Sequence, residues 1–147
     1  MSCESAQNPP QNALFVDFAA LLRDYGVPAG VREVLELNDG LVKGLAHSLD
    51  ELFVFMRLVF VRRAEHMDPF ERAFALYFFG VDIPPVAEGD PALFDTRQFR
   101  EWLEQQIAEG HIARRALWQY DPEELMRRFW DTLREQMEAH HGGSRWI

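Results

Sequence analysis

Apolar residues recur at steps of three and four over most of this chain, the spacing that gathers side chains on one face of an α-helix. The pattern predicts helices over residues 14–25, 29–44, 49–61, 68–79, 95–109 and 121–139, with one or two helical turns over 111–120. No stretch alternates convincingly between apolar and polar positions, as a half-buried strand would. We therefore predict an all-α fold, a single compact bundle of about six helices.

Two of these helices carry further expectations about burial. The helix over 29–44 is expected to turn one set of side chains inward: Val31, Val34, Leu35, Leu41, Val42 and Leu45. Asn38-Asp39-Gly40 weakens its middle, where we expect a bend. The helix over 49–61 is apolar nearly all round and should be the central, most buried one. Its Arg57 is either a rim residue whose stem lies along apolar surface or a paired buried charge.

Local signals at helix ends support these boundaries. Four helix starts carry an N-cap residue, in two cases with proline at the first helical position and in three with a capping-box partner. They are Ser48 with Glu51, Asp68 before Pro69, Asp95 with Gln98, and Asp121 before Pro122 with Glu124. Residues 81–94 contain three of the eight prolines, which predicts a surface connection. A boundary between two subregions of the chain could fall in this segment. We predict a disordered tail over 1–11, a helical domain over 12–141 and a C-terminal extension over 142–147.

Composition narrows the possible partners. The chain has 147 residues, of which 24 are acidic and 15 basic, and its net charge of −9 would repel a phosphate backbone, so nucleic acid is not an expected partner. The most apolar stretch, 52–61, is too short to cross a bilayer, which takes about 20 residues. The chain opens without a secretory signal pattern, and its single cysteine, Cys3, suits a reducing compartment. We expect a cytoplasmic protein without a membrane span.

Candidate chemistry is sparse. Glu138 and His141 have the Glu-x-x-His spacing of carboxylate-bridged di-iron bundles, but such a site needs two of these pairs. Glu65 and His66 are a second pair of neighbouring residues whose side chains can bind metals. The alternative hypothesis is therefore a metal-binding enzyme or a metal carrier that uses these four residues. No phosphate-binding glycine loop or nucleophile–base pair is visible. We expect no catalytic residue, no metal ligand and no cofactor.

The end of the sequence is unusual because Trp146 and Ile147 place two large apolar groups where water is the default neighbour. Three explanations are open. The two residues fold back on the last helix, or they dock on a partner, or the chain is the front part of a longer protein.

Three stretches together resemble a known family. The first is a helix, a Gly-x-Pro turn at Gly26–Pro28 and a second helix within residues 15–41. The second, within 49–80, combines a Leu-Asp-Glu-x-Phe start with a Glu-His pair and a Phe-Ala-x-Tyr-Phe run. The third is a His-x-Gly-Gly-x-x-Trp-Ile signature over 140–147. These features resemble the N-terminal helical region of bacterial CoxE-like proteins, which also carry a von Willebrand factor A domain.

The resemblance implies a non-enzymatic adaptor or assembly module. Its implied partners are a MoxR-type AAA+ ATPase, a von Willebrand domain or a client protein, and its implied role is the maturation of a metalloenzyme such as carbon monoxide dehydrogenase, or of another complex. The metal-ion site of the family belongs to the von Willebrand domain, so no ligands transfer to this chain. The candidate partner contacts are His140, Gly142, Gly143, Trp146, Ile147 and a corner formed by Arg62, Arg63 and His66.

Overall fold

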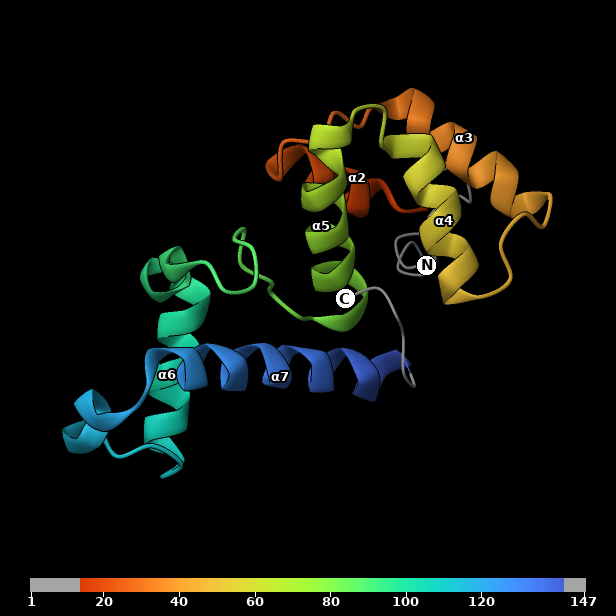
Figure 1. The fold of residues 1–147 in the computed structure, drawn as a ribbon. Helices are drawn as coiled ribbons and strands as arrows, with labels where there is room; N and C mark the ends of the chain where they lie inside the picture. Colours follow the sequence, from red (N-terminus) through yellow and green to blue (C-terminus); the bar gives the residue numbers. More distant parts are fainter. Residues whose placement is uncertain (1–13, 142–147) are drawn as a thin grey trace, which may run out of the picture. The chain divides into compact units, whose positions relative to one another are not determined.

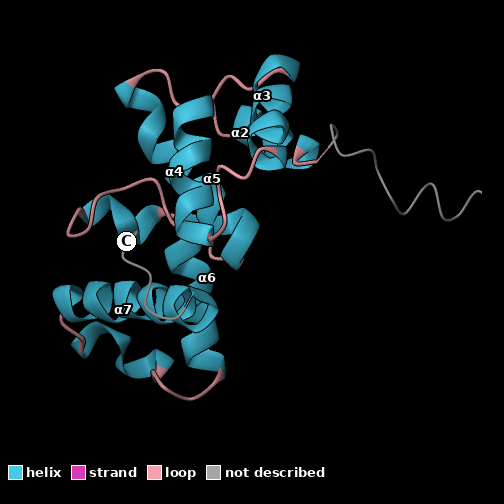
Figure 2. Ribbon diagram, turned by 90° about the vertical axis from the view of Figure 1, so that its right-hand side faces the viewer, coloured by secondary structure: helices cyan, strands magenta, loops and turns pink. Residues whose placement is uncertain are grey.

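The computed structural model describes residues 14–141, and residues 140 and 141 by their backbone alone. All regular elements in this range are helices, which confirms the all-α prediction (Figure 1, Figure 2). The α-helices are α2 (Val16–Asp24), α3 (Val31–Val42), α4 (Leu49–Phe60), α5 (Met67–Phe79), α6 (Arg97–Ala108) and α7 (Pro122–His141). The 3-10 helices are η2 (Ala64–His66), η3 (Pro91–Asp95) and η4 (Arg114–Gln119). None of the helices in 14–141 has the length and apolar character that a bilayer span needs.

The contacts within the chain divide it into two compact units. The first ends at Tyr77 and the second begins at Phe78, so the division falls near the end of α5, before the connection predicted over 81–94. The predicted tail over 1–11 and the C-terminal extension over 142–147 lie outside the described residues.

Phe18 is the centre of the core of the first unit. It is fully buried on α2, and its ring makes edge contacts with Phe60 of α4 and with Phe70 and Phe74 of α5, at centroid distances of 5.9–6.3 Å. Phe53 of α4 adds a perpendicular contact with Phe74 at 5.1 Å. Such aromatic pairs stabilise a core beyond the area that they bury. The amphipathic stripes of three helices therefore meet in one aromatic cluster.

Helix α3 packs against α4 through a position without a side chain. A Cβ atom added at Gly40 would lie 2.2 Å from Cζ of Phe55, so the ring of Phe55 occupies the space that a side chain would need. The glycine allows this close approach of ring and helix backbone. The helix is continuous through Asn38-Asp39-Gly40, the weak point of its sequence.

The helix starts of the first unit follow the sequence signals in part. Ser48 caps α4, because its Oγ accepts a hydrogen bond from the backbone N–H of Glu51 at 3.1 Å. The prediction for Asp68 was wrong: α5 begins at Met67, and the Asp68 carboxylate instead accepts from Nε of Arg72 at 2.9 Å. Gly80 follows the end of α5 with a φ of 69°, a conformation that glycine adopts without strain.

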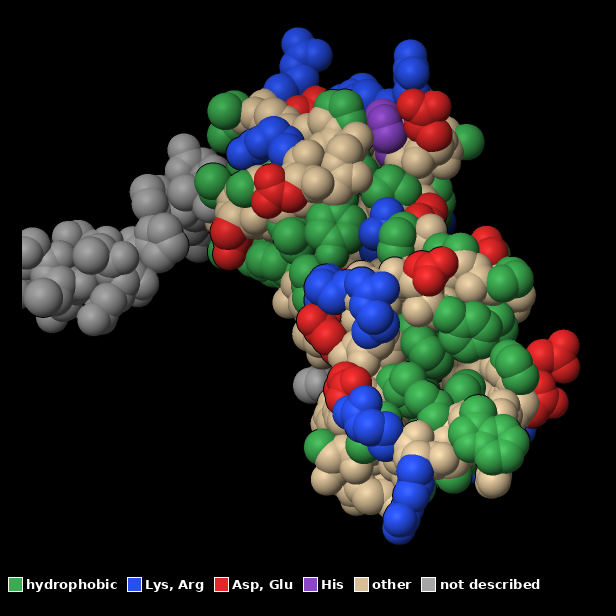
Figure 3. Space-filling view, turned by 90° about the vertical axis from the view of Figure 1, so that its left-hand side faces the viewer, with side chains coloured by type: hydrophobic (Ala, Val, Ile, Leu, Met, Phe, Trp, Pro, Cys, Tyr) green, Lys and Arg blue, Asp and Glu red, His purple; other side chains and the backbone are tan. Residues whose placement is uncertain are grey.

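The second unit has its own core where α6 and α7 cross. Phe99 and Trp102 of α6 pack against Phe129 of α7, with ring centroids 5.7 and 5.6 Å apart. Leu125, Leu133 and Met137 of α7 are buried with Phe129, and their spacing of four residues places all four on one side of the helix. Figure 3 shows hydrophobic side chains gathered on one face of this unit, in the lower part of the view, beside arginine and acidic side chains.

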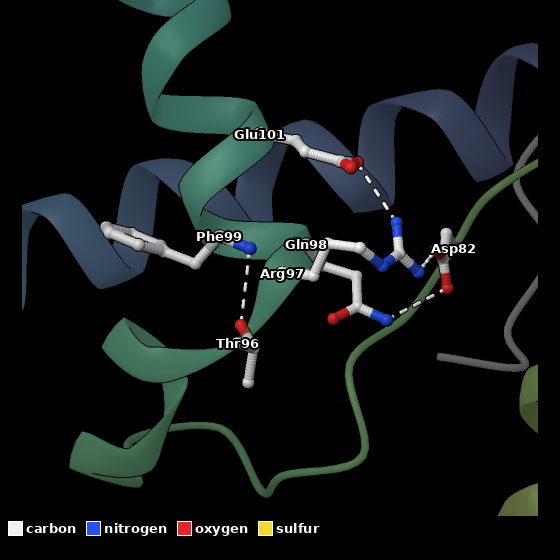
Figure 4. A network of polar contacts seen from close by, with 6 residues as sticks. All are labelled: Asp82, Thr96, Arg97, Gln98, Phe99 and Glu101. Carbon is white, nitrogen blue, oxygen red and sulfur yellow. Dashed lines mark hydrogen bonds and ion pairs between the residues drawn. The ribbon is translucent and has the colours of Figure 1, made fainter.

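The start of α6 differs from its prediction by one residue. Thr96, not Asp95, is the N-cap, and its Oγ1 accepts from the N–H of Phe99 at 3.2 Å (Figure 4). Gln98, which was predicted to close the capping box, donates instead to Asp82 Oδ1 at 3.1 Å. Arg97 contacts the same carboxylate at 2.5 Å. Asp82 therefore ties the connection after α5 to the first turn of α6.

The start of α7 confirms its main signal. Asp121 Oδ1 accepts from the N–H of Glu123 at 3.1 Å, and Pro122 is the first helical residue. Glu124, the predicted partner in a capping box, instead pairs with Arg128 at 2.7 Å. An i,i+4 ion pair of this kind stabilises a helix by about 0.2–0.5 kcal/mol.

Candidate interaction surfaces

The corner between α4 and α5 presents two exposed arginines. Arg62 Nη2 lies 3.1 Å from Glu33 Oε2, and Arg63 Nη1 lies 3.5 Å from Glu65 Oε2. The extended backbone at Val61 ends α4 and carries both arginines away from the helix axis. Their placement at the surface suits contact with an acidic or polar partner, since an arginine fork matches a carboxylate well.

His66, the third residue of the predicted corner, lies mostly below the surface. Only 14% of its side chain is exposed, and its Nε2 lies 3.8 Å from Glu65 Oε2. Its Nδ1 is buried and has no hydrogen-bond partner within the described part of the chain. The structure thus brings Arg62, Arg63 and His66 together along the chain but exposes only the two arginines.

Glu33 gives the corner a fixed anion. The backbone N–H of Gly30 donates to Glu33 Oε1 at 2.9 Å and lowers the pKa of this carboxyl, and Arg62 lowers it further. Glu33 is therefore ionised near neutral pH, so it holds Arg62 against the N-terminal turn of α3. Because the Arg62 side chain is 62% exposed, the pair contributes at most about 1 kcal/mol to stability, but it orients the guanidinium.

Arg57 of α4 and Glu71 of α5 interact through their charges. The guanidinium carbon of Arg57 lies 5.9 Å from the ring centroid of Phe53, and the residue is partly exposed, as expected of a rim residue. Burial raises the pKa of the Glu71 carboxyl and the charge of Asp68 raises it further, while Arg57 lowers it. Arg57 therefore acts both as a cover for Phe53 and as a counter-charge for Glu71.

A second surface is a row of exposed apolar residues on α3, Val31, Leu35 and Val42, here called the α3 stripe. Their spacing of four and seven residues places them on one side of the helix. Val31 is 76% and Val42 71% exposed. The predicted inward face was wrong for these three residues and for Leu45, which is also exposed. The buried arc is Val34, Leu37, Asn38 and Gly40.

Two contacts explain why α3 is rotated from the predicted orientation. The Gly40–Phe55 approach fixes the side that faces α4. Asn38 is buried because its Nδ2 donates to the carbonyl oxygens of Leu14 and Val34, each at 2.9 Å. A sequence pattern that treats asparagine and glycine as outward residues cannot find this face. The surplus of large apolar residues around α3 was the signal that a second face exists.

Helix α4 is also more exposed than predicted. Phe53, Met56, Val59 and Phe60 are buried, but Leu58 is 71% exposed and Val54 lies beside it on the outer side. The expectation that α4 is the most buried helix was wrong, because α4 packs through one side and α5 supplies more of the fully buried residues.

The remaining predicted contacts belong to the C-terminal signature over 140–147. Gly142, Gly143, Trp146 and Ile147 lie outside the described residues, and His140 is described by its backbone alone, near the end of α7. Their role in partner binding stays a prediction.

The metal hypothesis gains no support from the geometry. Within the described residues, no three His, Cys, Asp or Glu side chains come together in a way that could hold a metal ion. Glu65 and His66 are adjacent on η2, whereas Glu138 lies on α7 in the other unit. His141 is described by its backbone alone.

Comparison with known proteins agrees with the resemblance seen in the sequence. Residues 15–81 match the family model of the CoxE N-terminal helical bundle domain. No curated protein and no solved structure gave a significant match to the chain. The matched range covers α2 to α5 and contains both the arginine corner and the α3 stripe, whereas α6 and α7 lie beyond it. Over residues 15–81, a little less than half of the chain, the protein is therefore similar to the CoxE N-terminal helical bundle domain.

Proposed function

We propose that this chain is a non-enzymatic adaptor module of a CoxE-like protein, which holds a partner protein during the maturation of a metalloenzyme or another complex. In this proposal it acts in the cytoplasm together with a MoxR-type AAA+ ATPase. The partner class comes from the resemblance to CoxE-like proteins and from the domain match over 15–81.

The observation that carries the proposal is the α3 stripe. Val31, Leu35 and Val42 expose a row of large apolar side chains on a helix whose other side is fully used in the core. An exposed apolar row of this kind favours a protein contact, since burying it removes apolar surface from water. The exposed Arg62 and Arg63 add charged groups that select an acidic partner surface.

The test compares two double variants of the full chain. Leu35→Gln with Val42→Gln removes the apolar row on α3 without changing the charge. Val54→Gln with Leu58→Gln is the matched control, because it removes two exposed apolar residues from the outer side of α4. Glutamine is a good helix former, so both variants should keep the helical circular dichroism signal.

Binding to the purified MoxR-type ATPase from the same organism is then measured by biolayer interferometry. We expect the α3 variant to lose at least about tenfold in affinity, the effect of removing a central interface contact. The α4 control should stay within about twofold of the unchanged chain, as residues outside an interface do. An α3 variant that binds as tightly as the unchanged chain would contradict the proposal.

A further inference from the structure

The second unit contains a cleft that neither the domain match nor the adaptor proposal explains. It has a volume of about 700 Å³ and lies between the connection that runs through η3 and the first half of α7. This size is typical of sites for small molecules. Pro91 and Phe94 form one wall, and α7 forms the other with side chains at steps of three and four.

The floor of the cleft is apolar, and one of its residues carries an unsatisfied donor. Met126 and Trp130 of α7 form this floor, and Trp130 is 95% buried, since 5% of its surface is exposed. Its Nε1 is buried and has no hydrogen-bond partner within 14–141. The other buried tryptophan of this unit differs, because Trp102 Nε1 donates to Thr132 Oγ1 at 3.2 Å. A buried donor without an acceptor is costly, so an acceptor supplied by a ligand would be favourable here.

Arg127 supplies a second free donor next to Trp130. It lies one turn earlier on α7 and also lines the cleft. It does not pair with Glu123, four residues earlier, and no ion pair of its guanidinium is found among the described residues. Arg128, its neighbour, is paired with Glu124. Arg127 is therefore available to a ligand.

The other charged side chains that line the cleft carry a net charge of −2. Arg134 pairs with both Glu88 and Asp131, so these three residues leave one net negative charge within a closed network. Glu123 is the remaining acid of the cleft and makes no ion pair within the described range. It opposes an anionic ligand, whereas Arg127 attracts one.

We propose that this cleft binds a small apolar monocarboxylate, with its hydrocarbon body against the apolar floor and its carboxylate beside Trp130 Nε1 and the Arg127 guanidinium. A carboxylate satisfies both donors at once through charge-assisted hydrogen bonds. A neutral amide offers an acceptor to the indole but gains less from the arginine. This inference concerns residues outside the domain match and does not depend on the adaptor role.

The experiment uses the full chain labelled with ¹⁵N and 4-phenylbutyrate as the probe. The indole N–H resonance of Trp130 is assigned by its loss in Trp130→Phe and is followed during the titration. We expect it to shift on binding, with a Kd on the order of 1 mM for so small a ligand. The neutral analogue 4-phenylbutyramide should bind at least about fivefold more weakly.

Three variants test the assignment of roles. Arg127→Gln should weaken 4-phenylbutyrate by about five- to tenfold, and Glu123→Gln should tighten it by about twofold or more, since it removes the opposing charge. Arg128→Gln is the matched control, with the same charge change on the neighbouring residue of the same helix, and should leave the Kd within about twofold.

Two results would overturn the proposal. One is a Trp130 indole resonance that does not move with about 10 mM 4-phenylbutyrate, well above the expected Kd. The other is an equal affinity for the acid and the amide together with an unchanged Kd in Arg127→Gln. Because Arg127 is exposed, its replacement leaves the core intact and the result does not depend on how Trp130→Phe folds.

Discussion

Two polar side chains tie the start of α2 to the rest of the first unit. Asn38 is buried on α3 and donates to the carbonyl oxygens of Leu14 and Val34. Tyr77 donates from its hydroxyl to Asp17 Oδ1 at 2.9 Å. Burial, the hydrogen bond to Asp17 and the charge of that carboxylate together raise the pKa of Tyr77 to about 12. Both contacts join residues far apart in the sequence, so they fix tertiary structure rather than helix length.

The raised pKa of Tyr77 predicts a pH dependence of stability. The ordinary pKa of tyrosine is 10.0 and the folded value is about 12, so the folded state holds the phenolic proton more tightly than the unfolded state. The contribution is complete below pH 10 and is lost as the pH rises toward 12. In Tyr77→Phe this contribution is absent. Between about pH 9 and about pH 11 the free energy of unfolding should therefore fall more steeply in the unchanged chain, by roughly 1 kcal/mol after allowance for partial exposure.

Urea unfolding at several pH values measures this difference. The chain suits the measurement because it has one lysine and three tyrosines, so few groups titrate in this range. Tyr120→Phe is the control and should keep the slope of the unchanged chain, since it leaves the Tyr77–Asp17 hydrogen bond in place. If the free energy of unfolding changed with pH in the same way for the unchanged chain and for Tyr77→Phe, the folded structure would not raise the pKa of Tyr77.

At the scale of the element, α3 shows how a single glycine sets the rotation of a helix. Alanine at Gly40 would gain up to about 1 kcal/mol in helix propensity. The same methyl group would lie 2.2 Å from Cζ of Phe55, so the ring must move and lose its contact. As a single substitution, Gly40→Ala should leave the free energy of unfolding unchanged or lower it, because the two effects oppose each other.

A double-mutant cycle separates the two effects. In a Phe55→Ala background the main obstruction is gone, and the remaining close atom is Cδ1 of Leu45, at the end of a flexible side chain and 3.1 Å from the added Cβ atom. Gly40→Ala should then stabilise the chain by up to about 1 kcal/mol. The coupling between the two positions should therefore reach about 1 kcal/mol or more in urea unfolding. Additive effects of the two substitutions would mean that the ring of Phe55 does not determine the packing of α3 on α4.

Across the whole molecule, the sequence predicted the elements better than the faces that they present. Ser48 and Asp121 act as predicted because a cap depends on residues within one turn. The exposed face of α3 was missed because its rotation depends on Phe55 and Leu14, which lie far from Asn38 and Gly40 in the sequence.

The candidate surfaces divide in the same way. The exposure of Arg62 and Arg63 follows from their charge, whereas the burial of His66 depends on how η2 leads into α5. The cleft in the second unit was not predicted at all. Its signal is a donor that lacks an acceptor, on Trp130, and such a deficit is a property of the packed structure rather than of the residue pattern.

The predicted role of the C-terminal signature leads to a test on the full chain. If Trp146 and Ile147 contact the partner, deletion of residues 142–147 should abolish capture of the MoxR-type ATPase. It should change the free energy of unfolding by no more than about 1 kcal/mol, the scale of a surface change. Trp146→Ala alone should reproduce most of the loss, because a large aromatic residue is the typical anchor of an interface. Capture is measured by pull-down and stability by urea unfolding.

Deletion that leaves capture unchanged would assign partner binding to the α3 stripe alone, whereas a loss of several kcal/mol in stability would mean that Trp146 packs on the chain's own helices.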